Sequence, residues 1–221
     1  MDEVSEQTIA MRMMRALRTD IVTLVLKPGD IISESDMAAR HGVSRQPVRE
    51  AFIRLAQQGL LLIRPKRATV VKKISPDSVR QARFIRESIE VEIVRRVAGS
   101  VGAEAGPVLA GIIAAQEEAM ERDDTLAFYE RDDGFHHALA RLAEVEYAWQ
   151  LVDEHKMQLD RVRVLTLDKL AKETAVADHK AIIDRIVAGD AAGAEARMRQ
   201  HLQRAELRLI RMMSAHPEFF E

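Results

Sequence analysis

The chain of 221 residues contains no cysteine, so disulfide bonds and metal sites built from thiolates are both excluded. Aromatic residues make up only 4% of the sequence while hydrophobic residues make up 47%, a balance that is typical of helical proteins. No apolar run approaches the roughly 18 residues of a membrane span, and Met1 is not followed by a signal-peptide pattern. We therefore expect a cytoplasmic protein without a membrane-spanning segment.

Charge is divided unevenly along the chain, although its net value is only −2. Residues 1–75 contain 13 Lys and Arg against 8 Asp and Glu, a net charge of +5, whereas residues 76–221 contain 20 against 27, a net charge of −7. Only the amino-terminal part therefore has the charge expected of a module that contacts phosphates. The pattern predicts two domains, 1–75 and 76–221, with Ser75 capping the first helix of the second and Pro76 at its first position.

Hydrophobic periodicity and turn residues predict three helices and two strands in the first domain. The expected elements are helices over residues 7–27, 33–40 and 45–58 and strands over residues 61–64 and 69–71, joined by residues 65–68. This order is that of a winged helix-turn-helix, whose last helix enters the major groove of DNA while the hairpin reaches the adjacent backbone or minor groove. Lys66 and Arg67 at the hairpin tip are the expected wing contacts.

The stretch 42–49, Gly-Val-Ser-Arg-Gln-Pro-Val-Arg, indicates function most directly. Gly42 can adopt the positive φ that a tight turn between helices needs, and Ser44 can cap the helix that follows. Arg45 and Arg49 are four residues apart, so both guanidinium groups leave one helix face, where they can meet phosphates and guanine edges. An ordinary solvated helix start would carry the same pair, but the flanking sequence favours binding to double-stranded DNA.

Four side chains of the second domain are spaced so that they can converge. Asp132 and His136 share one helix face, while His179 and His201 lie about 10 residues before and about 12 residues after the turn at Gly189-Asp190. At about 1.5 Å per residue, antiparallel helices then place these two imidazoles at similar heights. One carboxylate and three imidazoles suit Zn²⁺, Ni²⁺ or Mn²⁺, although structural or exposed histidines would give the same spacing.

The amino-terminal part resembles the GntR family of bacterial transcription regulators. The residues that carry the resemblance are KPGDIISE at 27–34, MAARHGVSRQPVREA at 37–51, Arg54-Leu55, Gln58-Gly59-Leu60 and Arg64-Pro65. In that family the arginines of the recognition helix bind guanine and phosphate, which corresponds to Arg45 and Arg49 here. The resemblance also implies phosphate or base contacts for Ser44 and for Gln46, which stands where Thr is most usual.

The second part has no strand pattern and is expected to form a bundle of six or seven helices. The expected breaks lie near residues 99–106, 123–124, 143–146, 168–174 and 189–190. An all-helical domain behind such a winged helix resembles the FadR-type subgroup, whose effector domain is called FCD. The resemblance includes Asp132-Asp133-Gly134-Phe135-His136, Asp178-His179 and His201-Leu202, and it implies that the metal ligands are Asp132, His136, His179 and His201. His137 is expected at the surface, because it points about 100° away from its neighbour.

In this subgroup the metal helps to hold a small carboxylate effector with the assistance of nearby cations. The candidate cations are Arg83, Arg86, Arg161 and Arg163, although Arg83 or Arg86 could instead pair with Glu87 or Glu90. We expect a homodimer that binds a pseudo-palindromic operator, because a two-fold protein matches a two-fold site, and a repressor rather than an enzyme. Two alternatives remain open: a regulator that senses the metal itself, and a helical metalloenzyme fused to a DNA-binding module.

Overall fold

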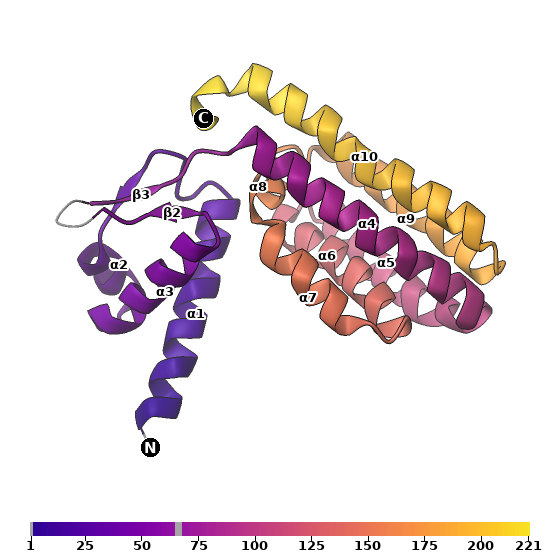
Figure 1. Cartoon of the computed structure of the whole chain (residues 1–221), viewed down its shortest axis with the longest axis horizontal. Helices are drawn as coiled ribbons and strands as arrows, with labels where there is room; N and C mark the ends of the chain where they lie inside the picture. Colours follow the sequence, from indigo (N-terminus) through magenta and orange to yellow (C-terminus); the bar gives the residue numbers. More distant parts are fainter. Residues whose placement is uncertain (1, 65–67) are drawn as a thin grey trace.

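The computed structural model describes residues 2–64 and 68–221, with side chains from Ile9 onward. A winged helix-turn-helix at the amino-terminal end lies beside a bundle of helices, as Figure 1 shows. The predicted fold class is therefore confirmed. Lys66 and Arg67, predicted as wing contacts, lie outside the described residues.

The winged helix-turn-helix combines three helices with a small antiparallel sheet. Its elements are α1 (Asp2–Val22), β1 (Ile31–Ile32), α2 (Glu34–His41), α3 (Arg45–Gln57), β2 (Leu61–Leu62) and β3 (Thr69–Val71). The strand order is β1-β3-β2, with Ile31 opposite Val70 and Leu61 opposite Val71. Strand β1 was not expected from the sequence, and α1 ends at Val22, before the predicted end at residue 27.

Local hydrogen bonds explain how the helix-turn-helix is built. Ser33 caps α2, because its Oγ accepts a hydrogen bond of 3.1 Å from the backbone N–H of Asp36. Gly42 ends α2 at φ 64°, a left-handed conformation that glycine adopts at little cost and that the sequence predicted. Ser44 occupies the cap position of α3, but its side chain makes no capping hydrogen bond, contrary to the expectation.

The second part of the chain is a helical bundle. Within residues 68–221 its elements are α4 (Pro76–Ser100), η1 (Gly102–Ala105), α5 (Gly106–Glu121), α6 (Thr125–Leu142), α7 (Glu146–His155), α8 (Met157–Leu165), α9 (Lys169–Val187), α10 (Ala191–Ala215) and η2 (Pro217–Phe219). Ser75 caps α4 as predicted, by accepting from the backbone N–H of Ser78. The break at Lys156, which separates α7 from α8, was missed, because no glycine or proline marks it.

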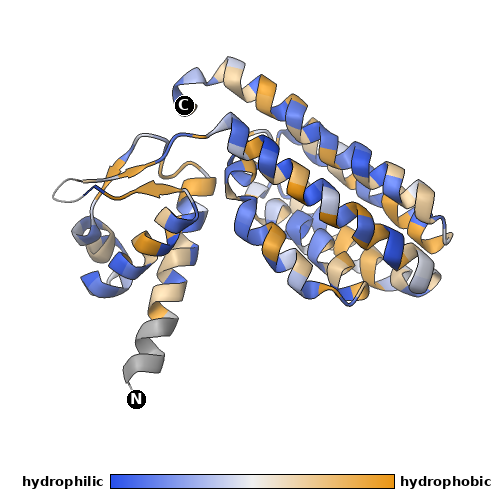
Figure 2. Cartoon of the chain, viewed as in Figure 1, coloured by the Kyte–Doolittle hydropathy of each residue, from blue (hydrophilic) through white to orange (hydrophobic). Residues whose placement is uncertain are grey.

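Apolar faces of the helices form the cores. Figure 2 shows apolar and polar residues interspersed along the helices of the bundle. In α10, for example, the buried residues Ala194, Met198, Leu202 and Leu209 recur at helical spacing on one face. Met157 at the start of α8 belongs to the core of the other domain, where it packs with residues such as Leu17, Phe52 and Leu60. Helix α8 therefore contacts both parts of the molecule.

The lengths and compositions of the helices bear on membrane insertion. Among the described residues, no single helix is both long enough and apolar enough to cross a membrane. The helices Pro76–Ser100 and Gly102–Glu121 meet that test only when taken together, and they are bent by 114° at their junction.

Candidate DNA-binding face and metal site

The start of α3 presents polar side chains to solvent. Arg45 and Arg49 are 66% and 54% exposed, and Ser44 and Gln46 are exposed beside them. The opposite face of α3 holds it in the core through Val48, Ala51, Phe52 and Leu55. Four of the six residues predicted to contact DNA thus lie together on the surface, at the cap and first turns of one helix.

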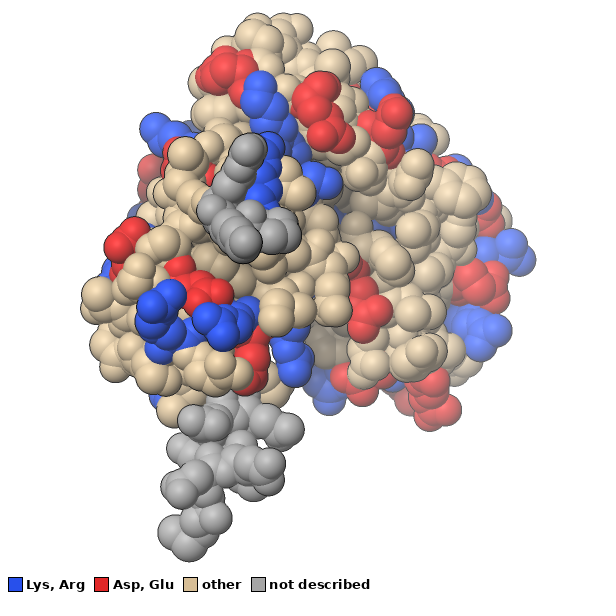
Figure 3. All heavy atoms as spheres, turned by 60° about the vertical axis from the view of Figure 1, so that its left-hand side comes forward, with Lys and Arg blue, Asp and Glu red and all other residues tan. Residues whose placement is uncertain are grey.

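One carboxylate lies against both arginines of this face. Glu34, the first residue of α2, accepts hydrogen bonds of 3.0 Å from Nε and Nη2 of Arg49, and its Oε2 lies 3.6 Å from Nη2 of Arg45. The hydrogen bond from Arg49 lowers the pKa of Glu34, so this side chain is ionised at neutral pH. Figure 3 shows basic and acidic side chains next to one another on the side of the molecule that carries the winged helix.

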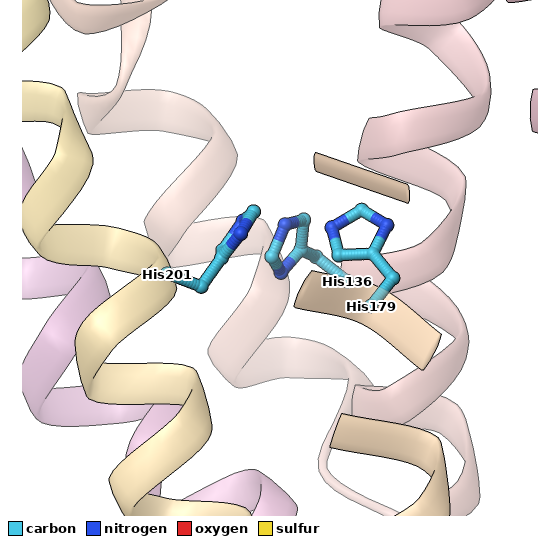
Figure 4. Close-up of side chains that lie close together, drawn as sticks. All are labelled: His136, His179 and His201. Carbon is cyan, nitrogen blue, oxygen red and sulfur yellow. The ribbon is translucent and has the colours of Figure 1, made fainter. Parts of the chain in front are cut away.

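Three of the four predicted metal ligands come together in the bundle. His136 of α6, His179 of α9 and His201 of α10 each offer a nitrogen, and these atoms all lie within 4.8 Å of one another. Figure 4 shows the three imidazole rings side by side between their helices. The ring centroids of His179 and His201 are 4.7 Å apart, and those of His136 and His201 are 5.3 Å apart. The predicted convergence of these three histidines, from α6 and from the consecutive helices α9 and α10, is therefore present.

The outer nitrogens of the three rings face polar side chains. Nδ1 of His179 lies 3.0 Å from Oε1 of Gln116, and Nδ1 of His201 lies 3.3 Å from Oδ2 of Asp178. Nδ1 of His136 lies 2.5 Å from Oε2 of Glu90. In protein metal sites such partners orient the ring and direct its other nitrogen toward the ion.

Burial favours the neutral form of His179 and His201. It lowers the pKa of His179 well below its usual value, and it also lowers the pKa of His201, where the hydrogen bond to Asp178 acts in the opposite direction. Both nitrogens of His136 and Nε2 of His179 are buried without a hydrogen-bond partner among the described residues, and Nδ1 of His136 makes only a charge contact with Glu90. Neutral imidazoles with unused nitrogens are the state that binds a divalent cation.

Asp132, the fourth predicted ligand, lies at the edge of the cluster. Its Oδ1 is 3.7 Å from Nε2 of His179, while its Oδ2 accepts a hydrogen bond from Nη2 of Arg163. Burial raises the pKa of Asp132, but the charge of Arg163 and smaller contributions from the three histidines together outweigh this effect and hold the pKa well below its usual range. The carboxylate is thus ionised and shared between the histidine cluster and an arginine.

A small cavity opens beside Asp132 and His201. Its volume of about 20 Å³ leaves room for little more than a water molecule. The basic side chains that line it are Arg83, Arg86, Arg163, Arg204 and Arg208. The structure thus brings three of the four predicted effector residues to one place, together with two arginines that were not predicted.

Arg83 and Arg86 also form the ion pairs within α4 that the sequence offered as an alternative to effector binding. Arg83 Nη1 donates to Glu87 at 2.7 Å, and Arg86 Nε donates to Glu90 at 2.6 Å. Because Glu90 also lies against His136, Arg86 is connected to the histidine cluster through that carboxylate. The two arginines therefore combine an ion pair within their helix with a place at the cavity.

Arg161 is not part of this cavity, which corrects the prediction for that residue. Its Nη1 donates to the backbone oxygen of Lys72 at 2.9 Å and to Oε1 of Gln158 at 3.2 Å, beside the winged helix. Arg161 and Arg163 are two positions apart on α8, so their side chains leave opposite sides of the helix. Burial lowers the pKa of Arg161 to about 10, so the side chain remains charged at neutral pH.

A network of buried charges runs from Asp132 toward α1. Arg163 Nη1 donates to Asp133 at 3.0 Å and to Asp160 at 2.9 Å. Lys156 Nζ then lies 2.5 Å from Asp133 and 2.6 Å from Asp160. The connection continues through Asp153, whose Oδ1 lies 3.2 Å from Lys156 Nζ and 3.0 Å from Nη2 of Arg18 on α1. The candidate site is thereby connected to the winged helix through side chains alone.

Several contacts of the site were not predicted from the sequence. They are those of His136 with Glu90, His179 with Gln116 and His201 with Asp178, and the presence of Arg204 and Arg208 in the cavity. Arg204 and Arg208 follow His201 by three and seven positions, so helical periodicity places them on its face and was a usable signal. His137, expected at the surface, is 40% exposed, and its Nε2 lies 2.8 Å from Glu146.

Comparison with known proteins agrees with this architecture. The family model described as "Bacterial regulatory proteins, gntR family" matches residues 10–71, and the model of the FCD domain matches residues 81–204. The HTH-type transcriptional repressor RspR of Escherichia coli (strain K12) is 38% identical over 198 residues, which cover 89% of this chain and 87% of RspR.

Solved structures share the fold. Escherichia coli McbR/YncC has a TM-score of 0.79 at 16% identity, covering 92% of this chain and 98% of that one. The metal-free FCD domain of TM0439 has a TM-score of 0.51 at 22% identity, covering 63% of this chain and 96% of that one. The matching families contain transcription regulators and not enzymes. The chain belongs to the GntR family of bacterial regulatory proteins and is a DNA-binding transcription regulator with an FCD domain.

Proposed function

We propose that this regulator is a homodimeric repressor whose helical domain, residues 76–221, holds a divalent metal ion and binds a small carboxylate effector at that ion. The domain of residues 1–75 binds the operator through Ser44, Arg45, Gln46 and Arg49, with Lys66 and Arg67 in the wing. The histidine cluster is the observation that carries the proposal, because it gathers three imidazoles from three helices at one point in the interior of the bundle.

The metal would be held by His136, His179 and His201 together with Asp132. The donor set of three imidazoles and one carboxylate suits Zn²⁺, Ni²⁺ or Mn²⁺. The unused, buried Nε2 atoms of His136 and His179 fit such an ion, because an unpartnered buried polar atom is otherwise costly. Bound there, the ion would supply positive charge and open coordination positions for an anionic ligand.

The arginines of the cavity favour an anionic effector. Arg83, Arg86, Arg163 and Arg204 are paired with carboxylates of the chain, whereas Arg208 forms no ion pair among the described residues. The 20 Å³ cavity is too small for an organic acid, so its side chains must move when one enters. The acid would therefore bind one arrangement of the domain more tightly than another, which is the requirement for a regulatory ligand.

The network of Arg163, Asp160, Lys156, Asp153 and Arg18 is a physical route from that movement to DNA binding. Arg163 touches Asp132 at the candidate site, and Arg18 belongs to α1, which packs against α3. A change at Asp132 that shifts Arg163 would alter the ion pairs of α8 and hence the position of the winged helix. In a dimer this would change the spacing of the two recognition helices.

The outer face of α4 and α10 supports the homodimer. It carries the exposed apolar side chains Phe84, Leu207 and Ile210. The two helices are joined by an ion pair of 3.2 Å between Arg80 and Glu206. An apolar surface of this kind is a candidate for a two-fold interface. Repression is proposed because RspR, 38% identical, is described as a repressor.

The first experiment measures metal content in protein purified without chelator. We expect one divalent ion per chain in the wild type and in the surface variant His137→Ala, and none in His179→Ala. Metal-free wild-type protein after incubation with Zn²⁺, Ni²⁺ and Mn²⁺ would contradict the proposed metal site.

The second experiment separates the carboxylate effector from sensing of the metal alone. Operator affinity is measured for metal-free protein, for metal-loaded protein, and for metal-loaded protein with succinate, malate or citrate. We expect metal loading alone to change affinity little and one of the acids to weaken it. A change produced by metal alone, with no further effect of any acid, would favour the metal-sensing alternative.

A further inference from the structure

The pairing of Glu34 with the recognition arginines bears on how DNA sequence is selected. Glu34 begins α2, whereas Arg45 and Arg49 begin α3, so the contact joins the two helices of the helix-turn-helix. The Glu34 side chain is only 23% exposed, while those of Arg45 and Arg49 are 66% and 54% exposed. The carboxylate therefore lies behind the guanidinium groups and not in front of them.

The geometry leaves the outer edge of Arg49 available. Glu34 accepts from Nε and from one hydrogen of Nη2, at 3.0 Å each. A guanidinium has five N–H groups, so both hydrogens of Nη1 and the second hydrogen of Nη2 remain. Two parallel N–H groups on Nη1 and Nη2 are what an arginine needs to bind O6 and N7 of guanine. Arg49 can thus bind guanine while it remains attached to Glu34.

The negative charge has a second effect on binding. Contacts with phosphates give affinity for any DNA sequence, whereas contacts with base edges give specificity. Glu34 compensates part of the positive charge of Arg45 and Arg49, and it restricts an arginine side chain that otherwise has many rotamers. Both effects disfavour sequence-independent phosphate contacts and favour a single orientation of Arg49.

We propose that Glu34 is a positioning residue for DNA recognition: it holds Arg49 for a guanine contact and limits binding to unrelated DNA. The residue reads no base itself and acts through the arginine. Its contribution lies in the ratio of operator affinity to non-specific affinity. This inference depends on DNA binding by α3 and is independent of the metal and the effector.

The test compares Glu34→Gln with two matched variants. Asp36→Asn removes one negative charge from the same first turn of α2, at a residue that forms no ion pair within the described part of the chain. Glu34→Asp keeps the charge but shortens the side chain by one methylene, which breaks the two-point contact. The DNA probes are a duplex selected by the wild-type protein from a random pool and a shuffled duplex of equal composition.

We expect Glu34→Gln to lower the ratio of the two affinities about tenfold, as expected for a disturbed bidentate guanine contact. Binding to the shuffled duplex should become tighter. The slope of log affinity against log salt concentration should also steepen, by about the amount that one additional phosphate contact contributes. Glu34→Asp should lower the ratio without tighter binding to the shuffled duplex, and Asp36→Asn should leave it within about twofold. A ratio unchanged in Glu34→Gln, or equally lowered in Asp36→Asn, would overturn the proposal.

Discussion

Arginine meets carboxylate in two very different surroundings in this molecule. On the DNA-binding face, Arg49 is half exposed and shares Glu34 with Arg45. In the bundle, Arg163 is only 7% exposed and contacts Asp132, Asp133 and Asp160. Exposed pairs contribute about 0–1 kcal/mol and are readily exchanged for other partners, whereas breaking a buried pair costs several kcal/mol. The exposed arginines are thus free to bind DNA, while the buried ones keep the candidate site in one arrangement.

The largest expected effect comes from breaking the buried network. In Lys156→Met, the carboxylates of Asp133 and Asp160 lose the ammonium group that lies within 2.6 Å of both. We expect the free energy of unfolding to fall by about 3–5 kcal/mol, measured by urea denaturation at neutral pH.

Arg96→Met is the matched control, because Arg96 forms an exposed pair with Glu92 in which both side chains are 56% exposed. It should cost no more than about 0.5 kcal/mol. Equal losses in the two variants would remove the distinction between the buried and the exposed pairs.

Metal removal is the next largest effect. A metal present at about 100 times its dissociation constant stabilises the fold by about 2.7 kcal/mol. Dialysis against EDTA should therefore lower the Tm of the wild type, and added Zn²⁺ should restore it. His179→Ala should show no response to Zn²⁺, whereas His137→Ala should respond as the wild type does. A Zn²⁺ response that survives in His179→Ala would count against the proposed ligands.

Loss of an exposed arginine should affect DNA binding without affecting the fold. We expect Arg49→Ala to weaken operator binding by about 1–3 kcal/mol and to change the free energy of unfolding by less than about 0.5 kcal/mol. Fluorescence anisotropy and urea denaturation measure the two quantities. Arg96→Ala, far from α3, should change neither. Operator affinity retained in Arg49→Ala would remove this residue from the recognition surface.

The smallest effect concerns the two serines that precede α2 and α3. Ser33 makes a capping hydrogen bond and Ser44 does not. Ser33→Ala should therefore cost about 1 kcal/mol of stability, while Ser44→Ala should cost only a few tenths. Thermal unfolding measures both. If Ser44→Ala is as destabilising as Ser33→Ala, the free hydroxyl of Ser44 is not available for phosphate.

The parts of the molecule that follow local rules could be predicted from the sequence. Gly42 and Ser75 mark helix ends through backbone conformation and capping, both of which depend on near neighbours. The convergence of His179 and His201 follows from their similar distances to a shared turn, which is also a local property.

The parts that depend on tertiary packing could not be predicted from the sequence. Gln116 meets His179 across 63 positions, and no spacing rule connects two helices that are not neighbours in sequence. Arg161 and Arg163 have the same residue type on one short helix, and only the position of α8 between two domains decides which one reaches the cavity. At the break between α7 and α8, Lys156 places its ammonium group among buried carboxylates, and no glycine or proline marks the position in the sequence.

Met157 has a consequence for the modularity of this protein. The side chain comes from α8 yet is 1% exposed in the core of the winged helix. A winged helix transplanted without α8 would keep an uncovered apolar site where the methionine packs. Chimeras that exchange effector domains between relatives should therefore retain a long, flexible apolar residue at this position. The core of the DNA-binding domain includes this side chain from α8, so the domain cannot be exchanged without it.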